Sequence, residues 1–222
     1  MADAATIASL ATAGGTLVLA IATFSATRSA NRSARIAERA LDLNLRPVLI
    51  PAHEWDAAER VTFFDEVVQL RGGYATVEQR GGNLYFAAQL RNVGAGIGVL
   101  TSWLVEVGPD LPPSSASSVS PVSSVSQLSL DPPPHYETFV PQLRSLYVPA
   151  GDVGYWQGAV RECDTERGDG AALRRAVEAG DRLTLWLRYS DPDGGHDTVT
   201  RYSLSADENG DWLFGIGRHW SL

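Results

Sequence analysis

The sequence predicts a mainly β protein, an antiparallel β-sandwich of the immunoglobulin-like kind, behind one long N-terminal helix that crosses a membrane. Three observations support this prediction. An uncharged stretch covers residues 4–27, several later segments alternate apolar and polar residues with period two, and glycine-rich or asparagine-rich turns separate those segments. We therefore expect a transmembrane and juxtamembrane helix over 1–45 and a β domain over 46–222.

The N-terminal stretch is long enough for a bilayer. As a helix, its 24 uncharged residues would extend about 36 Å. A helix buried in a soluble core and an amphipathic surface helix are the alternatives, but no polar face repeats at the helical period. Because no basic residue precedes the stretch, a cleavable signal peptide is not expected.

Four arginines follow this stretch at spacings of 4, 3 and 4, which places them on one face of a helix that continues to about residue 43. They are Arg28, Arg32, Arg35 and Arg39. Since positively charged flanks stay in the cytoplasm, we predict a single-pass protein of the bacterial cytoplasmic membrane, with its N-terminus outside and its β domain inside. The four arginines are expected to contact lipid phosphates at the membrane interface, and a solvated helix face is the alternative.

Small residues also recur at every fourth position of the helix, a pattern that resembles a stripe for close helix packing. The stripe comprises Ala4, Ala8, Thr12, Thr16 and Ala20. It indicates that the helix could pair with other helices.

The helix is expected to end at Arg46-Pro47, where the β domain begins, because proline disfavours helix at the preceding residue and cannot donate to the helical ladder. Strands are expected near 47–50, 61–70, 74–80, 84–91, 97–107, 153–160, 182–190, 197–205 and 211–218. Turn residues lie between them at 80–83, 191–195 and 209–210. One short helix is expected over 171–179, closed by Gly180. The Ser/Pro-rich segment 108–134 is expected to be a long surface loop, either a tolerated insertion or a functional lid.

Composition excludes several classes of protein. All 18 basic residues are arginine, so the lysine-dependent P-loop, Schiff-base and protein-kinase sites are disfavoured. The net charge is −8, while segment 28–46 carries +3. The remaining, acidic body would repel nucleic acid, so no nucleic-acid partner is expected.

No motif predicts a catalytic residue, a metal site or a cofactor. Segment 191–197 resembles a calcium loop, but His196 stands where that loop needs glycine and Tyr202 where it needs glutamate. A hairpin turn explains the same residues. Gly94, Gly96 and Gly98 do not follow the spacing of a dinucleotide loop and predict a strand connection instead.

Trp186 and Arg188 define a possible partner surface. Both alternate with the apolar face of their strand, and an exposed aromatic residue beside arginine suits protein recognition. A second covering layer would bury Trp186 instead.

Short segments carry a resemblance to a known group. These are Arg46-Pro47-Val48-Leu49, the run from Leu90 to Gly96, and Tyr189-Ser190-Asp191, behind the apolar helix and its basic collar. The chain resembles uncharacterised bacterial, actinobacterial-like single-pass membrane proteins with a β-sandwich domain. This resemblance implies the architecture and no activity.

Three functional hypotheses follow. The first is a membrane-anchored binding or assembly module that recruits a protein partner or its own copies. The second is an enzyme or sensor with a site made of scattered acids, for example Asp152, Asp164 and Asp191. The third is a structural subunit that packs through its transmembrane helix.

Overall fold

The computed structural model describes residues 3–63, 66–108, 132–162 and 170–222. The chain forms two compact units, Met1–Asn44 and Leu45–Leu222. The first unit is helical and the second contains the strands.

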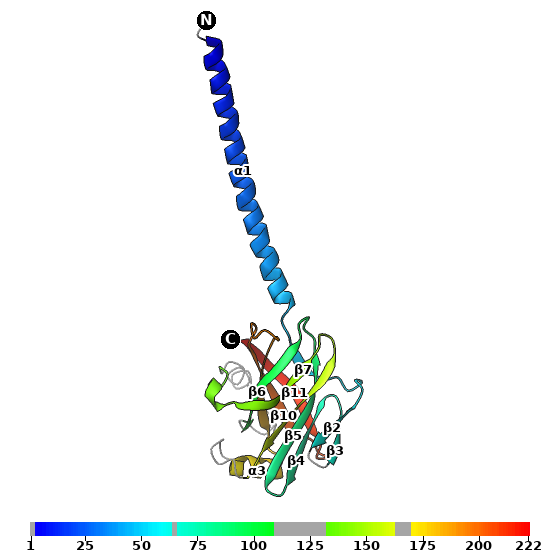
Figure 1. The fold of residues 1–222 in the computed structure, drawn as a ribbon. Coiled ribbons are helices and arrows are strands. Elements are labelled where there is room, and N and C mark those ends of the chain that lie inside the picture. The colour runs from blue at the N-terminus through cyan, green and yellow to red at the C-terminus, as the bar shows by residue number, and fades with distance from the viewer. Residues whose placement is uncertain (1–2, 64–65, 109–131, 163–169) are drawn as a thin grey trace, which may run out of the picture. The chain divides into compact units, whose positions relative to one another are not determined.

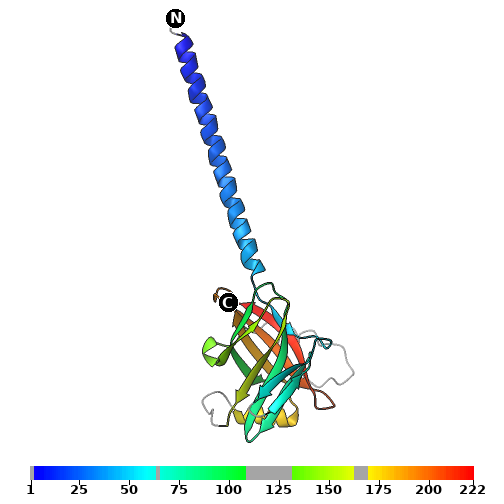
Figure 2. The ribbon, with the colours of Figure 1, turned by 45° about the vertical axis from the view of Figure 1, so that its right-hand side comes forward.

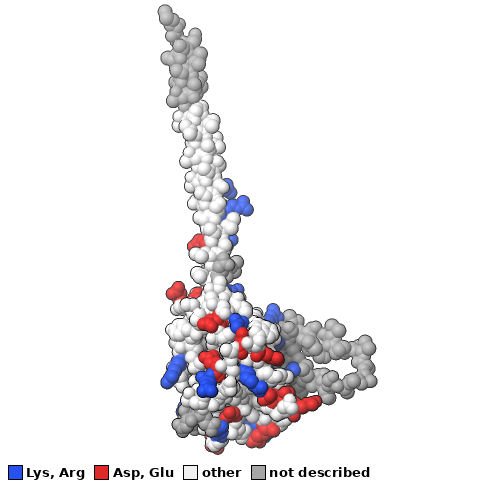
Figure 3. Space-filling model, turned by 90° about the vertical axis from the view of Figure 1, so that its right-hand side faces the viewer, with Lys and Arg blue, Asp and Glu red and all other residues white. Residues whose placement is uncertain are grey.

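The first unit is one long helix, α1 (Asp3–Asn44). At 1.5 Å per residue it extends about 63 Å. Every side chain described in it, from 14 to 41, is exposed, and the described part of the uncharged stretch, residues 14–27, is white above the blue arginines in Figure 3. Within the described residues, no helix is both long and apolar enough to cross a membrane, so the predicted transmembrane span is not supported. Gly14, Gly15 and Thr16 interrupt the apolar side chains there.

The second unit is built on one curled antiparallel sheet of nine strands (Figure 1). The strands, in chain order, are β1 (Leu49–Pro51), β4 (Tyr74–Arg80), β5 (Asn83–Asn92), β6 (Gly98–Val107), β7 (Val140–Val148), β8 (Val153–Val160), β9 (Leu183–Ser190), β10 (Thr198–Ala206) and β11 (Trp212–Ser221). Their order in the sheet is β1-β5-β4-β11-β10-β9-β6-β7, and β8 pairs with β5. A separate hairpin joins β2 (Glu59–Phe63) to β3 (Glu66–Leu70).

The mainly β prediction is therefore confirmed, whereas the sandwich of two packed sheets is not. Long strands and two irregularities let a single sheet curl round one core (Figure 2). The register shifts between Leu100 and Ser102 in β6 and between Arg201 and Tyr202 in β10. Such bulges bend a strand and increase its twist, which favours curling over stacking.

The inward face of the sheet holds the core. The residues expected to share one face are buried there: Leu84, Phe86, Ala88, Leu90, Leu183, Leu185, Leu187 and Tyr189. Trp103 of β6 and Trp156 of β8 meet edge to face, with ring centroids 5.5 Å apart. Helix α3 (Gly170–Ala179) adds Leu173 and Ala176 to this core and ends at Gly180, whose φ is 71°. That ending was predicted, because glycine adopts positive φ readily.

Three segments differ from the sequence prediction. Segment 61–70 lies across the β2–β3 hairpin, so it is not one strand; Val61 and Leu70 cover Ala87 on the outer face of β5. Strand β7 and the short 3-10 helix η1 (Tyr136–Thr138) were not predicted. Most of the predicted loop over 108–134 lies outside the described residues.

Two tyrosines hold β1 against the sheet. The backbone N–H of Leu49 donates to the Tyr189 hydroxyl at 3.2 Å, and the Tyr202 hydroxyl donates to the Leu49 carbonyl at 2.8 Å. All three residues are fully buried. The connection between β5 and β6 passes close by, because a Cβ added at Gly96 would lie 1.6 Å from the Leu45 carbonyl oxygen. The glycine-rich connection is therefore required by close packing, as expected of a strand connection and not of a nucleotide loop.

Candidate functional site

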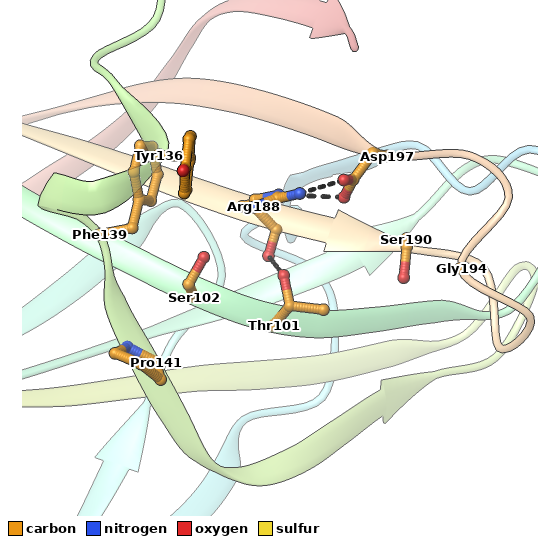
Figure 4. A pocket seen from close by; sticks show the side chains of 9 residues that line it. All are labelled: Thr101, Ser102, Tyr136, Phe139, Pro141, Arg188, Ser190, Gly194 and Asp197. Atoms are coloured by element: carbon orange, nitrogen blue, oxygen red, sulfur yellow. Dashed lines mark hydrogen bonds and ion pairs between the residues drawn. The ribbon is translucent and has the colours of Figure 1, made fainter.

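A pocket of about 400 Å³ opens on the outer face of the sheet (Figure 4). Three elements contribute to it: β6, β9 with the turn that follows it, and the segment from η1 into β7. Its lining comprises Thr101, Ser102, Tyr136, Phe139, Pro141, Arg188, Ser190, Gly194 and Asp197. The pocket therefore has an apolar wall and a polar wall.

The polar wall depends on the β9–β10 hairpin. Arg188 near the end of β9 pairs with Asp197 at the end of the turn, through Nε to Oδ1 at 3.1 Å and through Nη2 to Oδ2. The turn itself is held by Asp191, which accepts hydrogen bonds from the Gly195 N–H and contacts His196 Nδ1 at 2.6 Å. These contacts confirm the hairpin interpretation of segment 191–197.

The bulge in β6 adds Thr101 and Ser102 to the polar lining, whereas the apolar lining comes from Tyr136, Phe139 and Pro141. Thr101 has no register partner between Leu100 and Ser102, so its side chain lies on the outer face, where its hydroxyl donates to the Arg188 carbonyl at 3.0 Å. A bulge commonly re-aims a side chain in this way. Thr101 and Ser102 thus border the pocket together with Arg188 (Figure 4).

The two charges of the pocket stabilise one another. The hydrogen bond with Asp197 raises the pKa of Arg188 above its ordinary value, so the guanidinium stays charged. Both side chains are 29% exposed, so the pair remains accessible to a ligand from the solvent side. A two-point ion pair fixes the orientation of both groups.

Two polar groups of the described lining are already engaged by neighbouring residues. Nucleophilic catalysis needs a base within hydrogen-bond distance of the nucleophile. In the described lining, the one carboxylate, Asp197, is engaged by Arg188, and the Ser190 hydroxyl donates to the Asp191 carbonyl at 2.9 Å. The described residues contain no group of three or more His, Cys, Asp or Glu that could hold a metal ion.

The two residues predicted as a partner surface have different surroundings. Trp186 does point outward, away from the main core, but it is only 5% exposed, because Phe139 and Val199 pack with it in an outer apolar cluster. Its indole N–H donates to Glu106 at 3.0 Å. The covering layer was the alternative considered from the sequence. Arg188 remains accessible and lines the pocket.

Other predicted site residues are not gathered at the pocket. Arg28, Arg32, Arg35 and Arg39 lie exposed on α1, as the helical spacing predicted, and their contact with lipid stays a prediction. Asp191 lies in the β9–β10 turn beside the pocket. Asp152 lies in the β7–β8 turn, where it accepts a hydrogen bond from the Val153 N–H, and Asp164 lies outside the described residues.

Sequence reasoning missed most of the pocket lining, including Thr101, Tyr136 and Asp197. One signal could have suggested Asp197. The predicted hairpin brings the end of β9 beside the start of β10, where opposite charges attract across strands. Neither the bulge at Thr101 nor the 3-10 helix at Tyr136 has a comparable pattern in the sequence.

No protein-family model matches the chain, and no curated protein matches it.

Proposed function

We propose that the chain is a non-enzymatic binding or assembly module, in which α1 attaches the chain to apolar surroundings and the β domain recruits a protein partner. One observation carries this proposal. The large apolar side chains described in α1 are each more than half exposed: Leu17, Val18, Leu19, Ile21, Phe24, Ile36 and Leu41. Covering such a side chain fully is worth about 1.5–3 kcal/mol, so association of α1 is strongly favoured.

The arginines support lipid as those surroundings. Arg28, Arg32, Arg35 and Arg39 follow the uncharged stretch directly, and each could contribute about 1 kcal/mol beside anionic headgroups. This placement favours the inner leaflet of the bacterial cytoplasmic membrane as the location. The proposal concerns attachment and does not require the crossing predicted from the sequence.

Vesicle flotation tests the attachment. We expect the full-length chain to float with vesicles that contain an anionic lipid. A variant with Leu17→Ser, Leu19→Ser and Ile21→Ser should stay at the bottom of the gradient. The matched control replaces three exposed apolar residues of the β domain: Val67→Ser, Leu143→Ser and Leu213→Ser. Flotation of all three proteins alike would contradict the role of α1.

A structural subunit that packs through α1 is a second candidate. The observation that favours it is the continuous helix, which places Ala8, Thr12 and Thr16 near one face. If α1 packs on other helices, the full-length chain forms oligomers in detergent, and replacing these three residues with leucine abolishes the oligomers without changing the fold of the β domain. A monomer in detergent would eliminate this candidate.

A further inference from the structure

The sheet does not close between β7 and β8. These strands are joined by a short turn and lie side by side, as in a hairpin. Nevertheless, within the described residues β8 forms a ladder with β5 only, and β7 forms one with β6 only. The two facing strand edges form what we call the seam.

A side chain bridges the seam in place of a ladder. Gln142 Nε2 of β7 donates to the Gln157 carbonyl of β8 at 3.2 Å. The two backbones are therefore farther apart there than in a paired hairpin, where backbone groups bond directly. A strand between them would have an edge on each side.

The backbone groups that face the seam follow from the ladder with β5. In an antiparallel strand, the N–H and C=O of one residue point to the same side, and alternate residues share that side. Since the Gln157 carbonyl faces β7, the N–H and C=O groups of Tyr155, Gln157 and Ala159 all point into the seam. This row can pair with an added strand.

The facing part of β7 is also outside a ladder. In the register with β6, Leu100 pairs with Leu146 and Ser102 with Pro141, so segment 142–145 has no partner on β6. Within this segment, Leu143 is 95% exposed. Native sheets usually protect such edges, so an unpaired segment with an exposed leucine suits recognition.

Unsatisfied polar atoms gather at the same strand. Across the described chain, four buried side-chain polar atoms lack a hydrogen-bond partner, and two of them, Trp156 Nε1 and Gln157 Oε1, belong to β8. A third, Gln89 Oε1, belongs to the β5 residue that pairs with Tyr155. Trp156 is fully buried and Gln89 is 1% exposed. Buried polar groups normally find partners. Gln157 alternates with the core residue Trp156, so its side chain lies on the outer face of β8, on the strand that a bound polypeptide would extend.

We infer that the seam binds one extended segment of a partner protein, about six residues long, as a strand added beside β8. The inward-facing residues of the bound segment should be small, because the Trp156 and Trp103 rings already fill the inner face of β8 at Gly158. A Cβ added at Gly158 would lie 2.8–2.9 Å from these rings. Apolar residues would face outward, toward Leu143 and Tyr155. Because a separate edge of a folded sheet would meet β7 as well as β8, a single extended segment fits the seam better than a second copy.

This inference deepens the proposed function, because it names a surface and a class of partner for the recruiting domain. It involves only the β domain. Failure at the seam would leave flotation through α1 unchanged, and failure of flotation would leave peptide binding unchanged, so the two results are distinguishable.

Peptide binding to the full-length chain tests the inference. The probe is a fluorescent octapeptide that alternates alanine with valine or leucine, and its control carries proline at two central positions. We expect the alternating peptide to bind, with slower hydrogen exchange over residues 153–160, and the proline peptide to bind at least tenfold more weakly. Equal binding of both peptides, or no binding of either, would overturn the inference.

Variants of the seam sharpen the test. Ala159→Pro removes an N–H that faces the seam and leaves the ladder with β5 intact, so affinity should fall at least tenfold, while the matched Ala159→Ser should stay within twofold. Gln142→Ala removes the donor that occupies the Gln157 carbonyl, so affinity should rise about two- to tenfold. Unchanged affinity in Ala159→Pro, with hydrogen exchange showing β8 still folded, would overturn the inference. So would a dimer that pairs through β8 and excludes the peptide.

Discussion

Replacing Tyr202 with phenylalanine tests how β1 is held to the β domain. Leu49 directs both its N–H and its carbonyl away from β5, toward the hydroxyls of Tyr189 and Tyr202. These two side chains take the place of a neighbouring strand. Tyr202→Phe keeps the buried ring, which stacks on Phe214 with centroids 5.0 Å apart, and removes only the hydroxyl.

The expected loss of stability in Tyr202→Phe follows from the Leu49 carbonyl that stays buried in the variant. The Leu49 carbonyl is fully buried, so without the Tyr202 hydroxyl it loses its donor at 2.8 Å. A buried polar group left unsatisfied costs about 1–3 kcal/mol. For a domain of this size, about 1 kcal/mol lowers the melting temperature by roughly 2–4 °C. We therefore expect Tyr202→Phe to lower it by roughly 2–12 °C.

Denaturant unfolding of the full-length chain, followed by tryptophan fluorescence, measures the effect. Trp156 and Trp186 are buried in different clusters, so both should report the transition. The matched control is Tyr147→Phe, because Tyr147 is 60% exposed. That control should change the free energy of unfolding by less than about 0.5 kcal/mol. If Tyr202→Phe changed the free energy of unfolding as little as the control does, the Tyr202 hydroxyl would not hold β1 to the β domain.

Three further predictions concern pH, packing and the outer cluster. Partial burial, aided by the charge of Arg46, lowers the pKa of His219, so the unfolded state binds the extra proton first and stability should fall as pH drops below about 6.5. His219→Asn should flatten the melting temperature between pH 7.5 and 5.5, and an unchanged slope would contradict the assignment. Gly96→Ala would place a Cβ 1.6 Å from a backbone oxygen, so it should cost more than about 2 kcal/mol by denaturant unfolding, whereas Gly81→Ala, with open space around it, should cost less than Gly96→Ala. Trp186→Ala should cost about 3–5 kcal/mol by the same assay, and a loss below 1 kcal/mol would show that the outer cluster does not pack.

The sequence predicted most of the local structure of the β domain. The alternation of residues with period two predicted the buried face of β5 correctly, because each strand has one face on the core. Turn chemistry also succeeded: Asp207 Oδ1 accepts hydrogen bonds from the Asn209 and Asp211 N–H groups, and Gly210 has φ 84°. Such turns depend on neighbouring residues only, so they are visible in sequence.

What the sequence did not predict depends on long-range packing. A single curled sheet and two stacked sheets place the same residues inward, so alternation cannot distinguish them. Strand β7 was missed because its residues are mostly exposed and include Pro141, which breaks the expected pattern. The pocket needs Thr101, Tyr136 and Arg188 from three elements, and the bulge that places Thr101 on the outer face is not visible in the alternation of β6.

We expect α1 to associate through its exposed apolar surface. Sedimentation velocity of the full-length chain in buffer without detergent, with and without anionic vesicles, tests it most directly. We expect the chain either to sediment as an assembly larger than a monomer or to be depleted from solution by the vesicles. The variant with Leu17→Ser, Leu19→Ser and Ile21→Ser should do neither. A monodisperse monomer that does not bind the vesicles would contradict the association of α1.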